Sequence, residues 1–302
     1  MKHRLAFIVI ALSLLLAFPL PASAIYINVT NFPDENFRNY LLEQDYGKNG
    51  VLTEAEIKGI TSINVDEKEI RSLKGIEFFT ALTSLSCGYN WLTALDVSKN
   101  TALISLSCGF NQLKALDVSK NTALTYLDCS RNQLSALDVS KNTALASLTC
   151  HSNELTALDV SKNTALTDLN CSGTELTALD VSKNTALTSL LCGYNELTAL
   201  DVSKNTALTT LYCYGNQLTT LDVSKNTALT ELGCYGNNLK GEAMTALINS
   251  LLNNNSSVEH YFRAIFDPTA ETNILSKSQV AAVKAKGWIP QYIDFSYGWK
   301  EY

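Results

Sequence analysis

The chain has 302 residues, 17% of them charged, and a formal net charge of -6 at pH 7. This acidic balance, without a basic stripe, argues against nucleic acid as a partner, because phosphates are bound by clustered lysine and arginine. The chain contains 8 cysteines, and an even number in an exported protein would ordinarily suggest a disulfide framework.

Residues 1–24 have the features of a secretory signal peptide. Lys2 and Arg4 precede an apolar core over residues 5–18, and "PASA" ends at Ala24. The apolar run is shorter than the ~20 residues that cross a bilayer. We therefore expect cleavage after Ala24 rather than a retained anchor. The mature chain should be secreted or extracellular at the cell surface, with no membrane span.

Residues 25–59 are expected to form a helical N-terminal cap. The segment "PDENFRNYLLEQ" over 33–44 has the apolar spacing of a helix, and "DYGKNGVLTEAE" over 45–56 falls on the calcium-loop pattern of an EF-hand. The candidate metal ligands are Asp45, Asn49, Val51 and Glu56. Gly47 stands third, where a side-chain oxygen is expected. Two interpretations remain open: a calcium site, the only cofactor that the sequence suggests, and a metal-free cap.

Residues 60–239 are internally repetitive. A degenerate first repeat, residues 60–81, precedes eight copies of a 21-residue unit with the pattern LxxLxCxxNxL, as in "LTSLSCGYNWL" from Leu82. This is the leucine-rich-repeat pattern with cysteine in the third apolar position. The alternation Leu-x-Cys places both side chains on one face of a short strand. We predict a repeat solenoid, a leucine-rich-repeat horseshoe with one parallel concave β-sheet.

The cysteines occupy the same position in every copy: Cys87, Cys108, Cys129, Cys150, Cys171, Cys192, Cys213 and Cys234. Parallel, in-register cysteines point the same way rather than at each other, and a buried thiol behaves as a small hydrophobe. We expect free thiols in the core, with a disulfide ladder as the alternative.

The second half of each coil is nearly constant, since "LDVSKNTAL" occurs seven times. Twenty-one residues leave too little chain for a long helix, so the convex side should be extended or 3-10 chain. The ninth position carries asparagine in seven of the eight copies, and its amide is expected to satisfy backbone groups at the turn. Thr174 replaces it once, and we expect a local weakness there.

Residues 240–302 leave the period and should form an α+β C-terminal cap over the last coil. We predict a helix over 240–253, a strand over 259–266, a helix over 276–287 and a strand over 288–295. Ser276 and Gln279 form a capping-box pattern at the start of the second helix.

The chain resembles secreted bacterial leucine-rich-repeat proteins and, through its cap, the internalins. The resemblance rests on the helix around residues 37–42, on the junction "KGIEFFTALTSL" from Lys74, and on the regular repeats. It implies a concave strand face that binds other proteins, often on host cells. It implies no catalysis.

The positions that vary between copies are the third, fifth, seventh, eighth and tenth. The third, fifth and seventh face outward on the strand, so together they should tile one surface. The candidate ligand-binding residues are Tyr126, Asp128, Arg131, His151, Asp168, Leu191, Tyr194, Tyr212, Tyr214 and Tyr235. Tyrosine suits recognition because it offers a large contact area with a polar tip.

We therefore expect a non-catalytic recognition module that binds a protein ligand, which the resemblance places on host cells. Glycan binding through the tyrosine-rich late repeats is the alternative. His151 near Asp128 and Asp168 is the nearest approach to a catalytic constellation, but an open surface favours a polar contact patch. No enzyme activity is expected.

Overall fold

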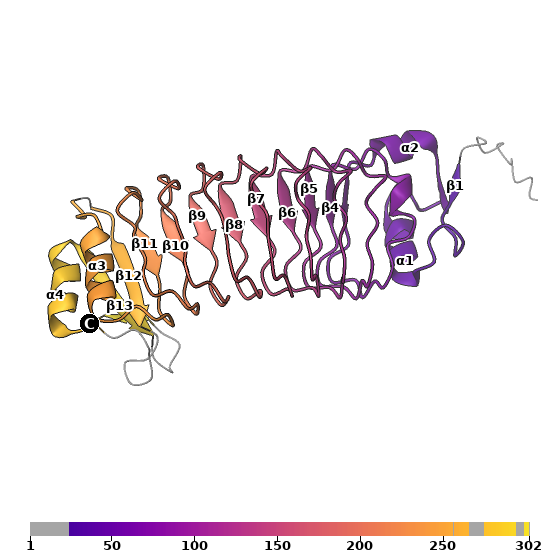
Figure 1. Cartoon of the computed structure of the whole chain (residues 1–302). Helices are drawn as coiled ribbons and strands as arrows, with labels where there is room; N and C mark the ends of the chain where they lie inside the picture. Colours follow the sequence, from indigo (N-terminus) through magenta and orange to yellow (C-terminus); the bar gives the residue numbers. More distant parts are fainter. Residues whose placement is uncertain (1–23, 256, 266–274, 294–298, 302) are drawn as a thin grey trace, which may run out of the picture.

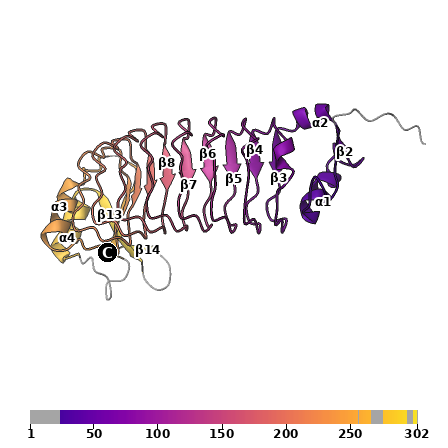
Figure 2. The ribbon, with the colours of Figure 1, turned by 45° about the vertical axis from the view of Figure 1, so that its right-hand side comes forward.

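The computed structural model describes residues 24–255, 257–265, 275–293 and 299–301. The signal peptide expected over residues 1–24 lies outside these ranges except for Ala24. The described chain is an elongated stack of coils with helices at both ends (Figure 1). The strands lie side by side along one face of this stack (Figure 2).

The N-terminal cap contains β1 (Ile25–Tyr26), α1 (Glu35–Glu43), β2 (Val51–Leu52) and α2 (Glu54–Gly59). Helix α1 begins after Asp34, whose carboxylate accepts a hydrogen bond from the N–H of Phe37. Phe37 and Leu41 are fully buried, and Phe37 meets Phe32 edge-on at 5.7 Å between ring centroids. Phe32 also meets Phe78 of the first coil at 5.6 Å between ring centroids, so the cap covers apolar side chains of that coil.

The coils contribute three-residue strands: β3 (Ser62–Asn64), β4 (Ser84–Ser86), β5 (Ser105–Ser107), β6 (Tyr126–Asp128), β7 (Ser147–Thr149), β8 (Asp168–Asn170), β9 (Ser189–Leu191), β10 (Thr210–Tyr212) and β11 (Glu231–Gly233). Neighbours pair in parallel with equivalent positions aligned, as Leu106 with Leu127. The convex halves of the described coils form turns and extended chain, and one 3-10 helix, η1 (Ile76–Phe78), lies in the first coil. The predicted solenoid is confirmed.

The core is a set of parallel columns of leucine, valine and cysteine. Each cysteine is fully buried and forms no disulfide in the described structure, in agreement with the expected free thiols. A coil cannot bury its own leucines, so stacking removes them from water at roughly 1.5–3 kcal/mol per buried side chain. Burial raises the pKa of the seven thiols from Cys87 to Cys213, that of Cys171 to about 12. The thiols therefore stay protonated at neutral pH.

Two columns of buried asparagine join the coils. In the first, the Asn111 amide donates to the carbonyls of Cys87 (2.9 Å) and Cys108 (3.1 Å), and its oxygen accepts from the N–H of Leu92 (2.9 Å). In the second, Asn121 donates to the carbonyls of Val97 (3.0 Å) and Asn100 (2.9 Å). Each bond satisfies a backbone group that the turn leaves unpaired.

Thr174 interrupts the first column. Its hydroxyl lies 3.0 Å from the Cys171 carbonyl and 2.6 Å from Oδ1 of Asn195. A hydroxyl has one proton, so Thr174 cannot reproduce the donors and the acceptor that an asparagine amide supplies at this position. The contact between these coils therefore has fewer hydrogen bonds than the equivalent contacts that contain asparagine.

The C-terminal cap contains α3 (Glu242–Ser250), β12 (His260–Ile265), α4 (Lys277–Ala285), β13 (Trp288–Ile293) and β14 (Trp299–Glu301). Strands β12 and β13 continue the parallel sheet, and β14 adds an antiparallel edge. The Ser276 capping box forms with Gln279. None of the helices in the described ranges has the length and apolar character that crossing a bilayer requires.

Candidate functional site

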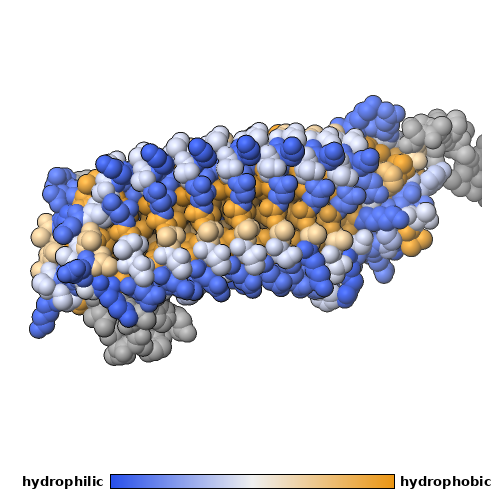
Figure 3. Space-filling view, viewed as in Figure 1, coloured by the Kyte–Doolittle hydropathy of each residue, from blue (hydrophilic) through white to orange (hydrophobic). Residues whose placement is uncertain are grey.

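The two long faces of the stack differ in chemistry. The face shown in Figure 3 carries an apolar stripe between hydrophilic rows that recur from coil to coil. The other face, here called the strand face, carries the third, fifth and seventh positions of the coils, which differ between copies. Because the register is unbroken from β3 to β11, these side chains form one continuous surface.

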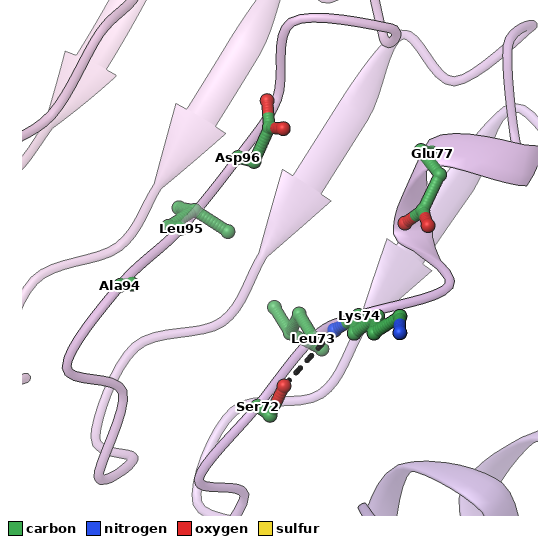
Figure 4. Close-up of a pocket in the computed structure, with 7 residues that line it drawn as sticks. All are labelled: Ser72, Leu73, Lys74, Glu77, Ala94, Leu95 and Asp96. Carbon is green, nitrogen blue, oxygen red and sulfur yellow. Dashed lines mark hydrogen bonds between the residues drawn. The ribbon is translucent and has the colours of Figure 1, made fainter. Parts of the chain in front are cut away.

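Depressions lie between coils on the convex side of the described chain. One of about 320 Å³ lies between the first coil and its neighbour, lined by Ser72, Leu73, Lys74, Glu77, Ala94, Leu95 and Asp96 (Figure 4). The hydroxyl of Ser72 accepts from the N–H of Lys74 at 3.2 Å. Similar depressions recur further along, as repeated residues require. Depressions lined by repeated residues have little power to discriminate between ligands.

The middle of the strand face carries Tyr126, Asp128, His151 and Asp168. Tyr126 is 38% exposed, and the Asp128 carboxylate is oriented by hydrogen bonds from the N–H (2.9 Å) and hydroxyl (2.6 Å) of Ser130. Asp168 accepts from Thr167 Oγ1 at 2.7 Å. These oriented carboxylates and the tyrosine hydroxyl suit polar contacts with a partner.

His151 contacts its own neighbour rather than an acid. Its Nδ1 lies 3.0 Å from the hydroxyl of Ser152. Burial, and then the nearby Arg131 charge, lower the pKa of His151, so the imidazole is neutral at pH 7. In the described ranges, no group of three or more His, Cys, Asp or Glu side chains could hold a metal ion.

The late coils carry a packed aromatic group, the late aromatic cluster, made of Tyr194, Tyr212, Tyr214, Tyr235 and Trp299. Tyr214 and Tyr235 stack nearly parallel, with centroids 4.6 Å apart and planes at 4°. Tyr194 meets Tyr214 edge-on at 5.0 Å, and Trp299 lies 5.8 Å from Tyr235. Leu191 lies beside Tyr212 in register on the adjacent strand. The structure thus brings together four of the predicted tyrosines.

Arg263 ties this cluster to the C-terminal cap. Tyr212 donates to Glu231, and Arg263 donates to both the Tyr212 hydroxyl and Glu231, the latter at 2.7 Å. The guanidinium also lies 4.9 Å from the Trp299 ring centroid. Burial and the bond to Glu231 raise the pKa of Tyr212 to about 12. The Tyr212 hydroxyl is therefore hydrogen-bonded to both Glu231 and Arg263.

The eighth position of every regular coil adopts left-handed backbone geometry. Glycine occupies it in three coils, at Gly173, Gly215 and Gly236. Side chains occupy it in the other five: Tyr89, Phe110, Arg131, Ser152 and Tyr194, with φ of 53°, 56°, 49°, 54° and 51°. Bulky residues rarely adopt this conformation. The Arg131 guanidinium lies 4.9 Å from the ring centroid of Phe110, the eighth residue of the preceding coil.

No protein-family model matches the chain. Over 71 residues it is 39% identical to Internalin J of Listeria monocytogenes. A solved functional domain of that protein, described as including a cysteine ladder, superposes with a TM-score of 0.62 at 34% identity and covers 82% of this chain. The chain is an internalin-like leucine-rich-repeat protein.

More distant structures share the fold alone. An internalin of Listeria monocytogenes, inlF, superposes with a TM-score of 0.55 at 19% identity, and each chain covers 93% of the other. A leucine-rich-repeat protein of Leptospira interrogans superposes with a TM-score of 0.53 at 20% identity, covering 66% of this chain.

The match to Internalin J is partial. The internalin-like chain spans 59% of the solved domain, and the aligned segment covers 23% of this chain and 8% of the Internalin J sequence. Internalins are bacterial surface or secreted proteins, and this type of fold is typical of non-catalytic surface recognition modules.

Three of the four candidate calcium ligands, Asp45, Asn49 and Glu56, already have other partners. Asp45 pairs with Lys48 at 2.5 Å, and Asn49 Oδ1 accepts from the N–H of Val51 at 2.9 Å. Glu56 caps α2 by accepting from Thr53 N at 2.7 Å. The third loop position offers no room, because a β-carbon on Gly47 would lie 1.8 Å from the Leu41 carbonyl oxygen.

Arg263 and Trp299 were not among the residues predicted from the sequence, because they come from the non-repetitive cap. The left-handed eighth position was missed too. Its signal was present in the sequence, since glycine stands at that position in three coils of the internalin-like chain.

Proposed function

We propose that this chain is a secreted, non-catalytic recognition protein that binds a protein partner through the strand face. The observation that carries the proposal is the contrast between the faces. The convex side repeats the same residues seven times, whereas the differing side chains lie in one unbroken register on the strand side. Only a surface whose residues differ along its length can distinguish one partner from another.

The shape of the strand face favours a large partner. Proteins recognise one another over broad surfaces, with aromatic anchors surrounded by polar groups. Tyr126 and Tyr194 are 38% and 57% exposed, and the carboxylates of Asp128 and Asp168 are held by short hydrogen bonds. Groups already held in place lose little conformational entropy when a partner binds.

The packing of the late aromatic cluster favours a protein over a glycan at that end. Sugar rings bind the open faces of aromatic side chains. Tyr214 and Tyr235 turn one face toward each other at 4.6 Å, and the Tyr212 hydroxyl is occupied by Glu231 and Arg263. The cluster presents ring edges and Tyr194 as an anchor. A host cell-surface protein is the partner class that the resemblance implies.

The test is capture of cell-surface proteins on the immobilised whole chain. Tyr126→Ala and Tyr194→Ala together remove two exposed anchors, and we expect them to abolish retention of proteins that the wild type captures. The matched control changes the convex side, Lys99→Ala with Lys162→Ala, and should leave retention unchanged. Undiminished capture by the tyrosine variant, or loss with the lysine variant, would show that the strand face is not the binding surface.

A further inference from the structure

A second aromatic group lies at the opposite end of the molecule from the late aromatic cluster. Tyr89, Trp91, Phe110, Gln112 and Arg131, here called the early aromatic shelf, line a shallow cavity of about 470 Å³ together with Asn90 and Asn111. They lie where the chain leaves β4, β5 and β6. Tyr89 is 53% exposed and Trp91 is 43% exposed. Large aromatic side chains exposed side by side indicate a contact surface.

The shelf is ordered by its own stacking. Tyr89 and Phe110 stack at 4.0 Å with planes at 16°, and the Arg131 guanidinium lies 4.9 Å from the Phe110 ring. The Arg71 guanidinium lies 4.2 Å from the Trp91 ring. The next two coils carry Ser152 and Gly173 at the eighth position, and a ring recurs there at Tyr194. The continuous run of two rings and a guanidinium group is therefore a feature of the first three regular coils.

Three side chains of the early aromatic shelf belong to residues with a strained backbone conformation. Tyr89, Phe110 and Arg131 all adopt left-handed conformations, with φ of 53°, 56° and 49°. Glycine would fit this position better, and three later coils use it. Strained non-glycine residues that persist in succession indicate a function for their side chains.

The chemistry of the shelf disfavours an added peptide strand. The backbone N–H groups of Tyr89, Trp91 and Gln112 donate to carbonyls of neighbouring coils at 3.0, 2.9 and 2.9 Å. The buried amides of Asn90 and Asn111 are likewise bonded to backbone. Since the backbone here is paired, a peptide cannot extend the sheet at this edge.

What the shelf offers is aromatic surface flanked by polar ends. Gln112 and Arg131 are exposed and can donate hydrogen bonds. Phe110 covers one face of the Tyr89 ring and Arg71 covers one face of the Trp91 ring. Tyr89 and Trp91 supply the ring surface that this packing leaves open, since they are 53% and 43% exposed. A pyranose ring has the complementary form, with a face of C–H groups and an edge of hydroxyls. We propose that the early aromatic shelf binds a pyranose unit of a glycan, its C–H face on Tyr89 and Trp91 and its hydroxyls on Gln112 and Arg131.

A glycan array probed with the whole chain tests this site. We expect the wild type to capture a defined set of glycans, and Trp91→Ala and Tyr89→Gly to weaken binding of the strongest one by roughly tenfold or more. Tyr89→Gly removes the ring while keeping a residue suited to the left-handed backbone, so a loss with unchanged circular dichroism is not unfolding. Tyr89→Phe should retain binding, because it keeps the ring.

Tyr194→Ala is the matched control. Tyr194 occupies the same eighth position in a late coil and should not contribute to glycan binding at the early aromatic shelf. An array that captures nothing would overturn the proposal. So would glycan binding that is lost with Tyr194→Ala and kept with Trp91→Ala, since that result places the site on the late aromatic cluster. Binding to a glycoprotein that survives enzymatic removal of its glycans would assign the shelf to polypeptide instead.

Discussion

The ring of Tyr214 lies directly against the backbone of Gly193 in the preceding coil, where a β-carbon would be 2.5 Å from Cε2 of the tyrosine. Tyr194 occupies the reciprocal position, because a β-carbon on Gly215 would lie 2.6 Å from its Cδ1. Each ring therefore fits into the space that glycine leaves in the adjacent coil, and the late aromatic cluster depends on these glycines.

Gly193→Ala should displace Tyr214 and loosen the cluster. We expect a loss of about 1–3 kcal/mol in the free energy of unfolding, as for other overpacked sites, measured by urea denaturation. Gly59→Ala is the control, because a β-carbon there meets nothing within 4 Å. Equal stability of the two variants would contradict the interlocking of ring and glycine.

Thr174→Asn should strengthen the weakest joint between coils. The asparagine restores the two-donor amide that the neighbouring coils use, and we expect a gain of about 1 kcal/mol in unfolding free energy. Asn153→Thr, the opposite change one coil earlier, should cost a similar amount. If Thr174→Asn lowers the thermal midpoint, this coil is adapted to threonine and is not a defect.

Ser152→Gly should stabilise the fold by relieving left-handed strain. Ser152 has φ of 54°, a conformation that costs an L-residue roughly 1–2 kcal/mol, part of which is offset by the greater freedom of glycine in the unfolded chain. A net gain of about 0.5–1 kcal/mol is expected in chemical denaturation. Ser172→Gly, at the preceding position of the next coil, should instead destabilise.

The buried thiols predict that the free energy of unfolding falls at alkaline pH. Folding raises the pKa of Cys171 and Cys213 from 9.0 to about 12, and burial raises that of five further thiols, Cys87, Cys108, Cys129, Cys150 and Cys192. The unfolded chain loses these protons first, so the stabilisation is complete below pH 9 and is lost as the pH rises toward 12. Each thiol adds a slope of up to about 1.4 kcal/mol per pH unit.

Urea unfolding at half-unit steps from pH 8 to pH 10 measures this slope, below the range in which tyrosine dominates. Replacing two thiols with alanine, Cys150→Ala and Cys171→Ala, should reduce the slope by about a quarter. A thiol reagent at pH 8 should modify the folded chain slowly and the urea-unfolded chain at every cysteine. Rapid labelling of the folded chain would contradict burial of the column.

Calcium should leave the N-terminal cap unchanged. Asp45 and Glu56 are bonded to Lys48 and Thr53, and Gly47 contributes no side-chain ligand. We expect the thermal midpoint in millimolar calcium chloride to equal that in EDTA. A shift that is abolished by Glu56→Gln would establish a calcium loop, since glutamine keeps the length of the side chain and removes its charge.

The solenoid could be predicted because its determinants are local and repeated. The spacing of Leu85 and Cys87 defines a strand face, and its recurrence every 21 residues defines parallel stacking. The candidate site was predictable only in part. Arg263 reaches Glu231 from the non-repetitive cap, a contact that no period encodes. The strain at Tyr89 depends on a backbone angle that residue type alone would have argued against.

The asparagine columns have a consequence for how such a chain can change in size. Their bonds between coils join residues 24, 21 or 19 positions apart, so inserting one whole repeat regenerates each of these bonds, while inserting part of one breaks them. Duplication or loss of complete units can therefore alter the reach of the molecule without any adjustment of its two ends. The number of coils can therefore change while the residues of both caps stay the same.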